Sequence, residues 1–325
     1  MISLTNKRPQ VAQTHIMSPL QYDILKTLLY FDIFDHPLKF EEIYQFLPSN
    51  SATPADIQLA CITEPLSGIL DVNGLFCSLR HNGKSTADQR LQKEVQAGEF
   101  WTFAIRFAAM MKYLPFVRAI FVSGELSKGV ASKESDVDFL VITAPKRLWH
   151  CRILFLIFKR MLPKKSRKLL CFNTFVSEEA LEYPSRNLYS ATEIATLKVL
   201  YNENLYSAYL DSNKWVHSFL PNFQVREQEF PAIDEHIPSI QKLYGLLFSA
   251  RFFDKLDEWL MSLWRRLITL KFSDVPPGER ERLFVCTPVF CSGYSMDHER
   301  RILDIYDRQL KTLNVEGNSR TSRGT

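Results

Sequence analysis

An apolar segment that begins with two aspartates places the strongest constraint on the fold of this chain. Residues 136–143 read DVDFLVIT, and the β-branched and aromatic residues after Asp138 are typical of a strand buried on both faces. Side chains two residues apart on a strand project from the same face, so Asp136 and Asp138 should lie side by side. The fold must therefore bury this strand while it holds two carboxylates together at one end.

The segments around this strand predict an α/β unit. Residues 116–124, FVRAIFVSG, have the composition of a buried strand, and residues 168–176, KLLCFNTFV, predict a third. A helical pattern precedes them from about residue 86 to 114, and Pro145 begins another helix that extends to about residue 161. We therefore expect a small mixed sheet with flanking helices over residues 86–190.

The N-terminal region predicts three helices followed by a hairpin. Ser18, Pro19 and Gln21 form a helix-start pattern, which Thr53, Pro54 and Asp56 repeat. A short helix is expected between them, at residues 39–47, and Asn73-Gly74 within an alternating segment is a strong hairpin signal. This order is typical of a winged-helix module, which we place at residues 18–85 after an N-terminal tail of residues 1–17.

A winged helix often binds DNA through its third helix, but this one lacks the charge for it. The segment carries Asp56 and Glu64 and no Lys or Arg, whereas phosphate contacts require cations. We therefore favour a packing or protein-contact role for this module over DNA binding.

The C-terminal region, residues 191–313, is expected to be mostly helical. Ser190 and Glu193 have capping-box spacing before a helix, and residues 237–272 form a long pattern of Leu, Phe and Trp interleaved with Lys and Arg. We interpret the Trp and Phe stripe as core-facing. Residues 282–291 are a candidate strand, residues 297–313 a last helix, and residues 314–325 a disordered tail.

The aspartate pair suggests a divalent cation. Two adjacent carboxylates repel each other, and magnesium, which takes oxygen ligands and substrate phosphates, removes that cost. Gly124 ends the preceding strand, where its lack of a side chain permits close approach of a phosphate to backbone N–H groups at the next helix start.

Strand, glycine turn, helix start and Asp-x-Asp on the next strand together resemble the DNA polymerase beta superfamily of nucleotidyltransferases. The matching residues are Ser123-Gly124-Glu125, ten further residues, and Asp136-Val137-Asp138-Phe139. The arrangement of a winged helix in front and helices behind is similar to bacterial stand-alone nucleotidyltransferase-like proteins.

The resemblance implies transfer of a nucleoside monophosphate from a nucleoside triphosphate to a hydroxyl group. Asp136 and Asp138 would be the catalytic residues and would hold two Mg²⁺ ions. Ser123, Gly124, Glu125 and Lys128 would lie around the phosphates, and the acceptor can be a protein, an RNA or a small molecule.

Two departures from the family pattern leave a second interpretation open. Glu125 stands where the family has Ser or Gly, and the position of the usual third carboxylate falls near Asn173, which can ligate a metal but cannot act as a base. Glu178 or Glu179 can substitute only if the chain bends back. The first alternative to an active transferase is a degenerate protein that binds nucleotide or a partner without turnover. The second alternative is a winged-helix DNA-binding regulator.

A run of cations follows the aspartate pair without any acidic residue before Glu178. It comprises Lys146, Arg147, Arg152, Lys159, Arg160, Lys164, Lys165, Arg167 and Lys168. Such a run is either a solvated helix end or a landing surface for a polyanion such as RNA or the triphosphate.

Composition sets the remaining expectations. The net charge of +4 is too small to indicate nucleic acid by itself, and the six cysteines lack metal-binding or disulfide spacing, so we expect them reduced and mostly buried. No apolar run approaches the length of a membrane span, and the first residues lack the apolar core of a signal peptide. We therefore expect a cytoplasmic protein with no membrane partner.

Overall fold

The computed structural model describes residues 17–50, 52–80, 87–225, 233, 238–293 and 295–321. These residues form a mixed α/β protein in which helices cover both faces of a central sheet. Residues 1–16 of the expected N-terminal tail lie outside the described part. Within that part, no helix combines the length and the hydropathy that crossing a bilayer requires.

The N-terminal module contains the expected helices and hairpin. Its helices are α1 (Pro19–Asp32), α2 (Phe40–Phe46), α3 (Pro54–Ile62) and α4 (Leu66–Ile69), and its strands are β1 (Leu38–Lys39), β2 (Leu70–Asn73) and β3 (Phe76–Leu79). The three strands have the order β1-β3-β2. Capping boxes begin α1 at Ser18 and α3 at Thr53, and the predicted turn has Gly74 at φ +61°. Local sequence therefore determines much of this module.

The central sheet has six strands in the order β7-β4-β5-β6-β9-β8. They are β4 (Val117–Ser123), β5 (Val137–Thr143), β6 (Leu170–Ser177), β7 (Lys198–Tyr201), β8 (Phe284–Cys286) and β9 (Phe290–Gly293). β5 and β6 are parallel, and every other neighbouring pair is antiparallel. The three strands expected from the sequence, β4, β5 and β6, are consecutive at the middle of this sheet.

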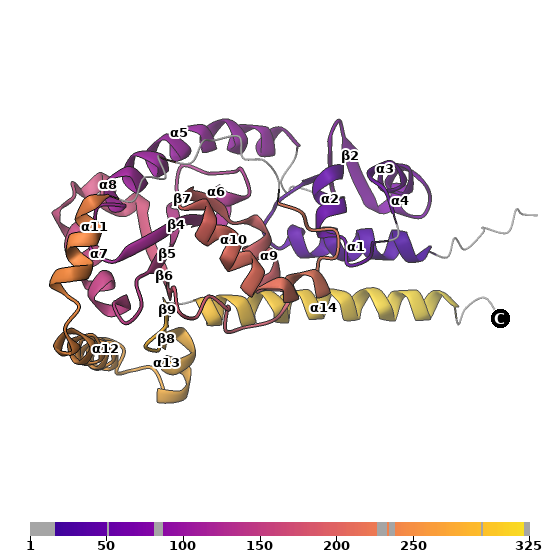
Figure 1. Ribbon diagram of the computed structural model, residues 1–325. Coiled ribbons are helices and arrows are strands. Elements are labelled where there is room, and N and C mark those ends of the chain that lie inside the picture. Colours follow the sequence, from indigo (N-terminus) through magenta and orange to yellow (C-terminus); the bar gives the residue numbers. More distant parts are fainter. Residues whose placement is uncertain are drawn as a thin grey trace, which may run out of the picture.

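Alternate residues of β5 pack into two different cores, as the apolar sequence of this strand requires. Phe139 and Val141 face the layer formed by α5 (Ala87–Met111) and α7 (Leu148–Met161). Leu140 and Ile142 face the layer of α9 (Leu188–Thr196), α10 (Glu203–Ser212) and the N-terminal module. Figure 1 shows α5 on one side of the sheet and α9, α10 and α14 (Ser295–Thr321) on the other.

The C-terminal region contributes strands as well as helices. Its other elements are the 3-10 helix η1 (Lys214–Ser218), α11 (Ser239–Leu247), α12 (Arg251–Lys271) and α13 (Pro277–Leu283). The sequence pattern extended one helix through residues 198–201, but these residues form β7, because they pair with β4 at the sheet edge. The single pattern of residues 237–272 is divided between α11 and α12, and α14 continues to Thr321, into the range expected to be a tail.

The interpretation of the Trp and Phe stripe as core-facing is wrong for part of α12. Trp264 is half-buried and packs against the sheet layer, but Phe252 is 66% exposed and Trp259 is 57% exposed. The helix has more apolar surface than its neighbours cover. All six cysteines are free, and five of them are buried, as expected; Cys171 is half-buried.

Candidate functional site

The glycine turn and the aspartate pair meet at one end of β4 and β5. β4 ends at Ser123, which lies opposite Asp138 in the antiparallel ladder, and the short helix α6 (Gly124–Ser127) follows directly. Gly124 has a φ of +69°, and a Cβ atom at this position would lie 2.4 Å from Oδ2 of Asp138. Glycine is therefore required both by the backbone conformation and by the approach of the carboxylate.

The two aspartates lie in different environments. Asp136 is exposed just before β5, whereas Asp138 is half-buried within it. Burial, and then the negative charge of Asp136, raise the pKa of Asp138 to about 6. The negative charge on Asp138 is therefore held at a cost in free energy, which a nearby cation would relieve.

Cys171 and Asn173 of β6 complete this cluster. The ligand atoms of Asp136, Asp138 and Cys171 all lie within 4.8 Å of one another, although groupings of this kind on a surface do not by themselves identify a metal site. The register between β5 and β6 shifts by one residue after Asp138, which makes a bulge beside Asn173. The amide Nδ2 of Asn173 donates to Oδ1 of Asp138 at 3.4 Å, so Asn173 lies where the sequence placed it, beside the pair.

Glu125 and Lys128, both expected to lie near phosphates, have partners within the chain. Glu125 Oε2 accepts a hydrogen bond from the hydroxyl of Ser135 at 2.6 Å, which ties the turn to the loop before β5. Lys128 Nζ donates to the carbonyl oxygen of Gly124 at 3.1 Å and to Oε1 of Glu193 at 2.7 Å. Lys128 thus stabilises the turn through these two bonds. The backbone around Gly124 is therefore a better candidate for a phosphate contact than the side chain of Lys128.

Glu178 and Glu179 do not belong to the site. The backbone N–H of Glu178 donates to the carbonyl oxygen of Thr143, at the far end of β5, and its carboxylate lies 3.4 Å from Arg118. Thr143 is five residues beyond Asp138 along β5, or about 17 Å at the usual rise per residue. Neither glutamate can replace a third carboxylate in this conformation.

Two residues near the aspartate pair, Cys171 and Glu193, do not belong to the sequence motif. Cys171 lies opposite Asp138 in the ladder, and burial, followed by the charge of Asp138, raises the pKa of its thiol. Glu193 of α9 contributes to the raised pKa of Asp138. The sequence could have indicated that Cys171 belongs to the site, because it lies two residues before Asn173 on a predicted strand. No residue close to Glu193 in the sequence indicates that Glu193 lies near Asp138.

The donor set fits magnesium better than a softer metal. Asp136 and Asp138 offer carboxylate oxygens, and rotation of the Asn173 amide would present its oxygen in place of Nδ2. Cys171 is a poor ligand for magnesium, because this hard cation prefers oxygen to sulfur. The site can therefore offer three oxygen ligands and leave further positions to substrate and water.

Most cations of the basic run already bind other groups within the fold. Five of its cations bind carbonyl or carboxylate oxygens of the chain: Lys146, Arg147, Arg152, Lys159 and Arg167. The four exposed cations that remain are Arg160, Lys164, Lys165 and Lys168. Three of these lie on α8 (Lys164–Leu169), which leads directly into β6 and Cys171. Positive charge is thus present near the aspartate pair, but on a smaller surface than the sequence suggests.

A cavity of about 340 Å³ lies on the other side of α6, between the N-terminal module and the sheet domain. Its lining includes Lys39, Glu42, Arg90, Trp101, Lys128 and Lys198. Its volume is in the range of small-molecule sites, about 300 to 1,000 Å³. Lys128 both lines this cavity and donates to the carbonyl oxygen of Gly124.

Comparisons of this chain with protein-family models, with curated proteins and with solved structures find no significant match. The assignment of a function therefore depends on the geometry of the site itself.

Proposed function

We propose that this protein is a magnesium-dependent nucleotidyltransferase, which moves a nucleoside monophosphate from a nucleoside triphosphate to a hydroxyl acceptor. The observation that carries the proposal is the meeting of Gly124 with Asp138, where a glycine turn at positive φ opens directly onto the aspartate pair. The succession of β4, the turn at Gly124, the short helix α6 and then β5 with the aspartate pair also matches the motif of the polymerase beta superfamily that the sequence resembles. A turn without side chains beside two carboxylates suits a phosphate and its metal.

The roles of the residues follow from their positions. Asp136 and Asp138 would hold the metal, with the side-chain oxygen of Asn173 as a third ligand, and backbone N–H groups after Gly124 would bind the triphosphate. When bound, magnesium supplies positive charge to the phosphate oxygens. The acceptor hydroxyl would form a bond to the α-phosphorus as the bond to pyrophosphate breaks. Its proton would pass to water at the exposed edge of the site, because an amide such as Asn173 cannot accept it.

A transfer assay tests this proposal directly. The protein is incubated with nucleoside triphosphates labelled at the α-phosphate, magnesium and a cell extract, and labelled products are separated by size. We expect an acceptor to become labelled, and Asp136→Ala or Asp138→Ala to abolish labelling. Asp71→Ala is the matched control, because Asp71 is exposed on β2 and far from the site in the fold. Labelling that survives both substitutions at the pair would refute the proposal.

Nucleotide binding without turnover is the second candidate, and one observation favours it. Asn173 occupies the place of a third carboxylate, and Glu178 and Glu179 lie at the opposite end of the strands. The third position of the motif therefore supplies no base, and the two other carboxylates near the pair, Glu125 and Glu193, are bound to Ser135 and Lys128. Under this alternative, magnesium and a nucleoside triphosphate together would raise the melting temperature, and the rise would disappear in Asp138→Ala, while no label is transferred.

A further inference from the structure

The helix α12 exposes a continuous apolar stripe that the fold does not cover. Its members recur at helical spacing, and four of them are exposed: Phe252, Trp259, Leu267 and Leu270. Leu256 and Leu263 fill the positions between them and are half-buried. Leu270 is 75% exposed, so the stripe extends along the whole helix. Exposed apolar surface of this extent usually marks an interaction site.

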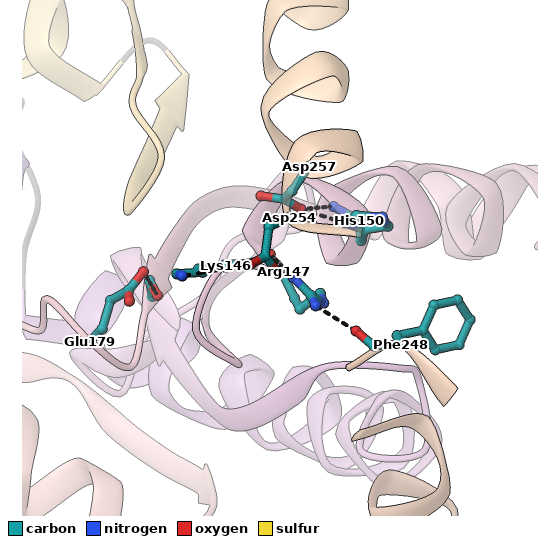
Figure 2. A network of polar contacts seen from close by, with 8 residues as sticks. Lys146, Arg147, His150, Glu179, Phe248, Asp254 and Asp257 are labelled. Atoms are coloured by element: carbon teal, nitrogen blue, oxygen red, sulfur yellow. Dashed lines mark hydrogen bonds and ion pairs between the residues drawn. The ribbon is translucent and has the colours of Figure 1, made fainter. Parts of the chain in front are cut away.

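Polar contacts on the opposite side fix the orientation of this helix. Asp254 accepts a hydrogen bond from Arg147 at 2.7 Å, and Asp257 Oδ1 accepts from both Nδ1 and the backbone N–H of His150, at 2.6 and 2.9 Å (Figure 2). Asp257 thereby caps the first turn of α7, which has no side-chain cap of its own. The side chain of Asp257 is almost fully buried, so α12 cannot turn its apolar stripe inward without losing these contacts.

The helix that precedes α12 in the chain, α11, also exposes apolar side chains. Leu243, Leu246 and Leu247 are exposed on α11, and the chain turns into α12 just before Phe252. Figure 1 shows α11 and α12 at the end of the molecule that is remote from α1 to α4. The exposed leucines and aromatic residues of the two helices therefore lie at that end of the molecule.

The charges beside this surface are predominantly positive. Lys242, Arg251, Lys255, Arg266 and Lys271 are exposed on the two helices. Of the three acidic residues on the same helices, Asp254 and Asp257 are bound to α7 and its N-terminal turn, which leaves Glu258 as the exposed acid. A helix with Leu, Phe and Trp on one face and Lys and Arg beside it is the pattern of helices that lie in the interface of an anionic membrane.

We propose that α11 and α12 form a docking surface for an anionic phospholipid bilayer, with the apolar stripe inserted among the acyl chains and the flanking cations at the headgroups. This proposal departs from the sequence expectation of no membrane partner, which was based on the lack of a run long enough to span a bilayer; a helix that lies on a bilayer needs no such run. This role is independent of the proposed transferase activity. It would hold the protein at a membrane surface.

The charges argue against the other occupants of this surface. If two copies paired through α12, Lys255 of one copy would approach Lys255 or Arg266 of the other, in either relative direction, and like charges would repel. A nucleic acid would be attracted by the cations but would gain nothing from an exposed Trp, Phe and Leu stripe held on a rigid helix. An anionic bilayer satisfies both the charge and the apolar area.

Vesicle co-sedimentation of the full chain tests the proposal. Vesicles of equal parts phosphatidylcholine and phosphatidylglycerol are compared with vesicles of phosphatidylcholine alone, at low and high salt. We expect binding to the anionic vesicles that weakens with salt. The double variant Phe252→Glu, Trp259→Glu should bind at least about tenfold more weakly, because two large side chains lose their insertion energy. Lys255→Glu, Arg266→Glu should weaken binding to anionic vesicles while Phe252 and Trp259 are intact.

A matched control separates this surface from general exposed hydrophobicity. Leu75, in the turn between β2 and β3, is 65% exposed, and Val95, on α5, is 81% exposed; Leu75→Glu, Val95→Glu should bind as the wild type does. Circular dichroism and melting temperature confirm that each variant is folded. Failure of the wild type to bind anionic vesicles at low salt would overturn the proposal. So would equal losses in the control, or a dimer in sedimentation that the Phe252 and Trp259 substitutions dissociate while vesicle binding persists.

Discussion

The position that a Cβ atom would take on Gly124 lies 2.4 Å from Oδ2 of Asp138. The glycine thus does two things at once: its φ of +69° turns the chain from β4 into α6, and its missing side chain leaves room for the carboxylate. Gly129 has a similar φ of +74°, but no atom lies within 4 Å of its Cβ position. Substitution at Gly129 would therefore cause backbone strain alone, whereas substitution at Gly124 would cause the same strain and also displace the carboxylate of Asp138.

Replacement of each glycine by alanine should therefore give different results. Gly129→Ala should lower the free energy of unfolding by about 1 to 3 kcal/mol through backbone strain alone. Gly124→Ala should lower it further and also displace Asp138, so that Mn²⁺ affinity measured by calorimetry falls in this variant and is unchanged in Gly129→Ala. Equal Mn²⁺ affinities in the two variants would show that Asp138 does not bind the metal or that its position does not depend on Gly124.

The pKa of Asp138 predicts how stability changes with pH in the metal-free protein. Its pKa is raised from 3.8 to about 6 in the folded state, so the folded state binds the proton more tightly than the unfolded state. The charged side chain therefore destabilises the protein fully above about pH 6, and this cost disappears as the pH falls through 6 towards 4.

Removal of the charge should remove this dependence. We expect Asp138→Asn to raise the free energy of unfolding at pH 7 by roughly 1 to 3 kcal/mol, the size of a shift of about two pKa units, and to have little effect near pH 4. Urea denaturation at a series of pH values measures both. Asp71→Asn, an exposed substitution on β2, serves as the control and should leave the profile unchanged. A wild type that gains stability between pH 4 and 6 relative to Asp138→Asn would contradict the prediction.

Local patterns were sufficient to predict the elements that carry the motif. The Asn73-Gly74 hairpin, the capped starts of α1 and α3, and the run of strand, turn and strand around Gly124 all depend on residues close in sequence. Asn173 was also placed correctly beside Asp138, because its strand was recognised and parallel neighbours bring corresponding positions together.

Contacts between distant segments account for what the sequence did not predict. Residues 198–201 continue a helical pattern, but they pair with β4, and Ile120 lies opposite Tyr201. The environment of Phe252 and Trp259 depends on how far α7 covers α12, which periodicity does not reveal. Glu193 reaches the site only because α9 packs beneath β4, so a motif search along the chain cannot identify it.

Restoring a third carboxylate at the site is the next test. Asn173→Asp adds an anionic oxygen ligand beside Asp138 and should increase Mn²⁺ affinity several-fold at pH 8, where the carboxylates are ionised. Without metal it should be less stable than the wild type, because a third negative charge joins Asp136 and Asp138. Calorimetry and urea denaturation measure the two effects, with Asn173→Ala as the control that removes the ligand. Unchanged or weaker Mn²⁺ binding by Asn173→Asp would mean that β6 does not face the metal.

The buried Arg90 of α5 connects the N-terminal module to the rest of the protein. Its guanidinium is 2% exposed and donates to the carbonyl oxygen of Pro37 at 2.9 Å, to Glu42 at 2.9 Å, to Glu94 at 3.0 Å and to Nε2 of His36. Burial, and then the charge of Arg90, hold the pKa of His36 well below its usual value, so its ring is neutral and can accept this bond. Arg90 thus donates hydrogen bonds to acceptors in the N-terminal module and in α5.

Loss of this cation should be costly. Arg90→Ala should lower the free energy of unfolding by roughly 2 to 4 kcal/mol, below the value for a fully buried pair because Glu42 and Glu94 retain some contact with water. Arg90→Lys should recover little of it, since one ammonium cannot reach all four partners. Arg300→Ala is the control: Arg300 and Asp304 form an exposed pair, and its loss should cost less than about 0.5 kcal/mol. Urea denaturation measures the three variants, and a cost for Arg90→Ala no larger than that for Arg300→Ala would show that the two parts of the chain do not depend on this contact.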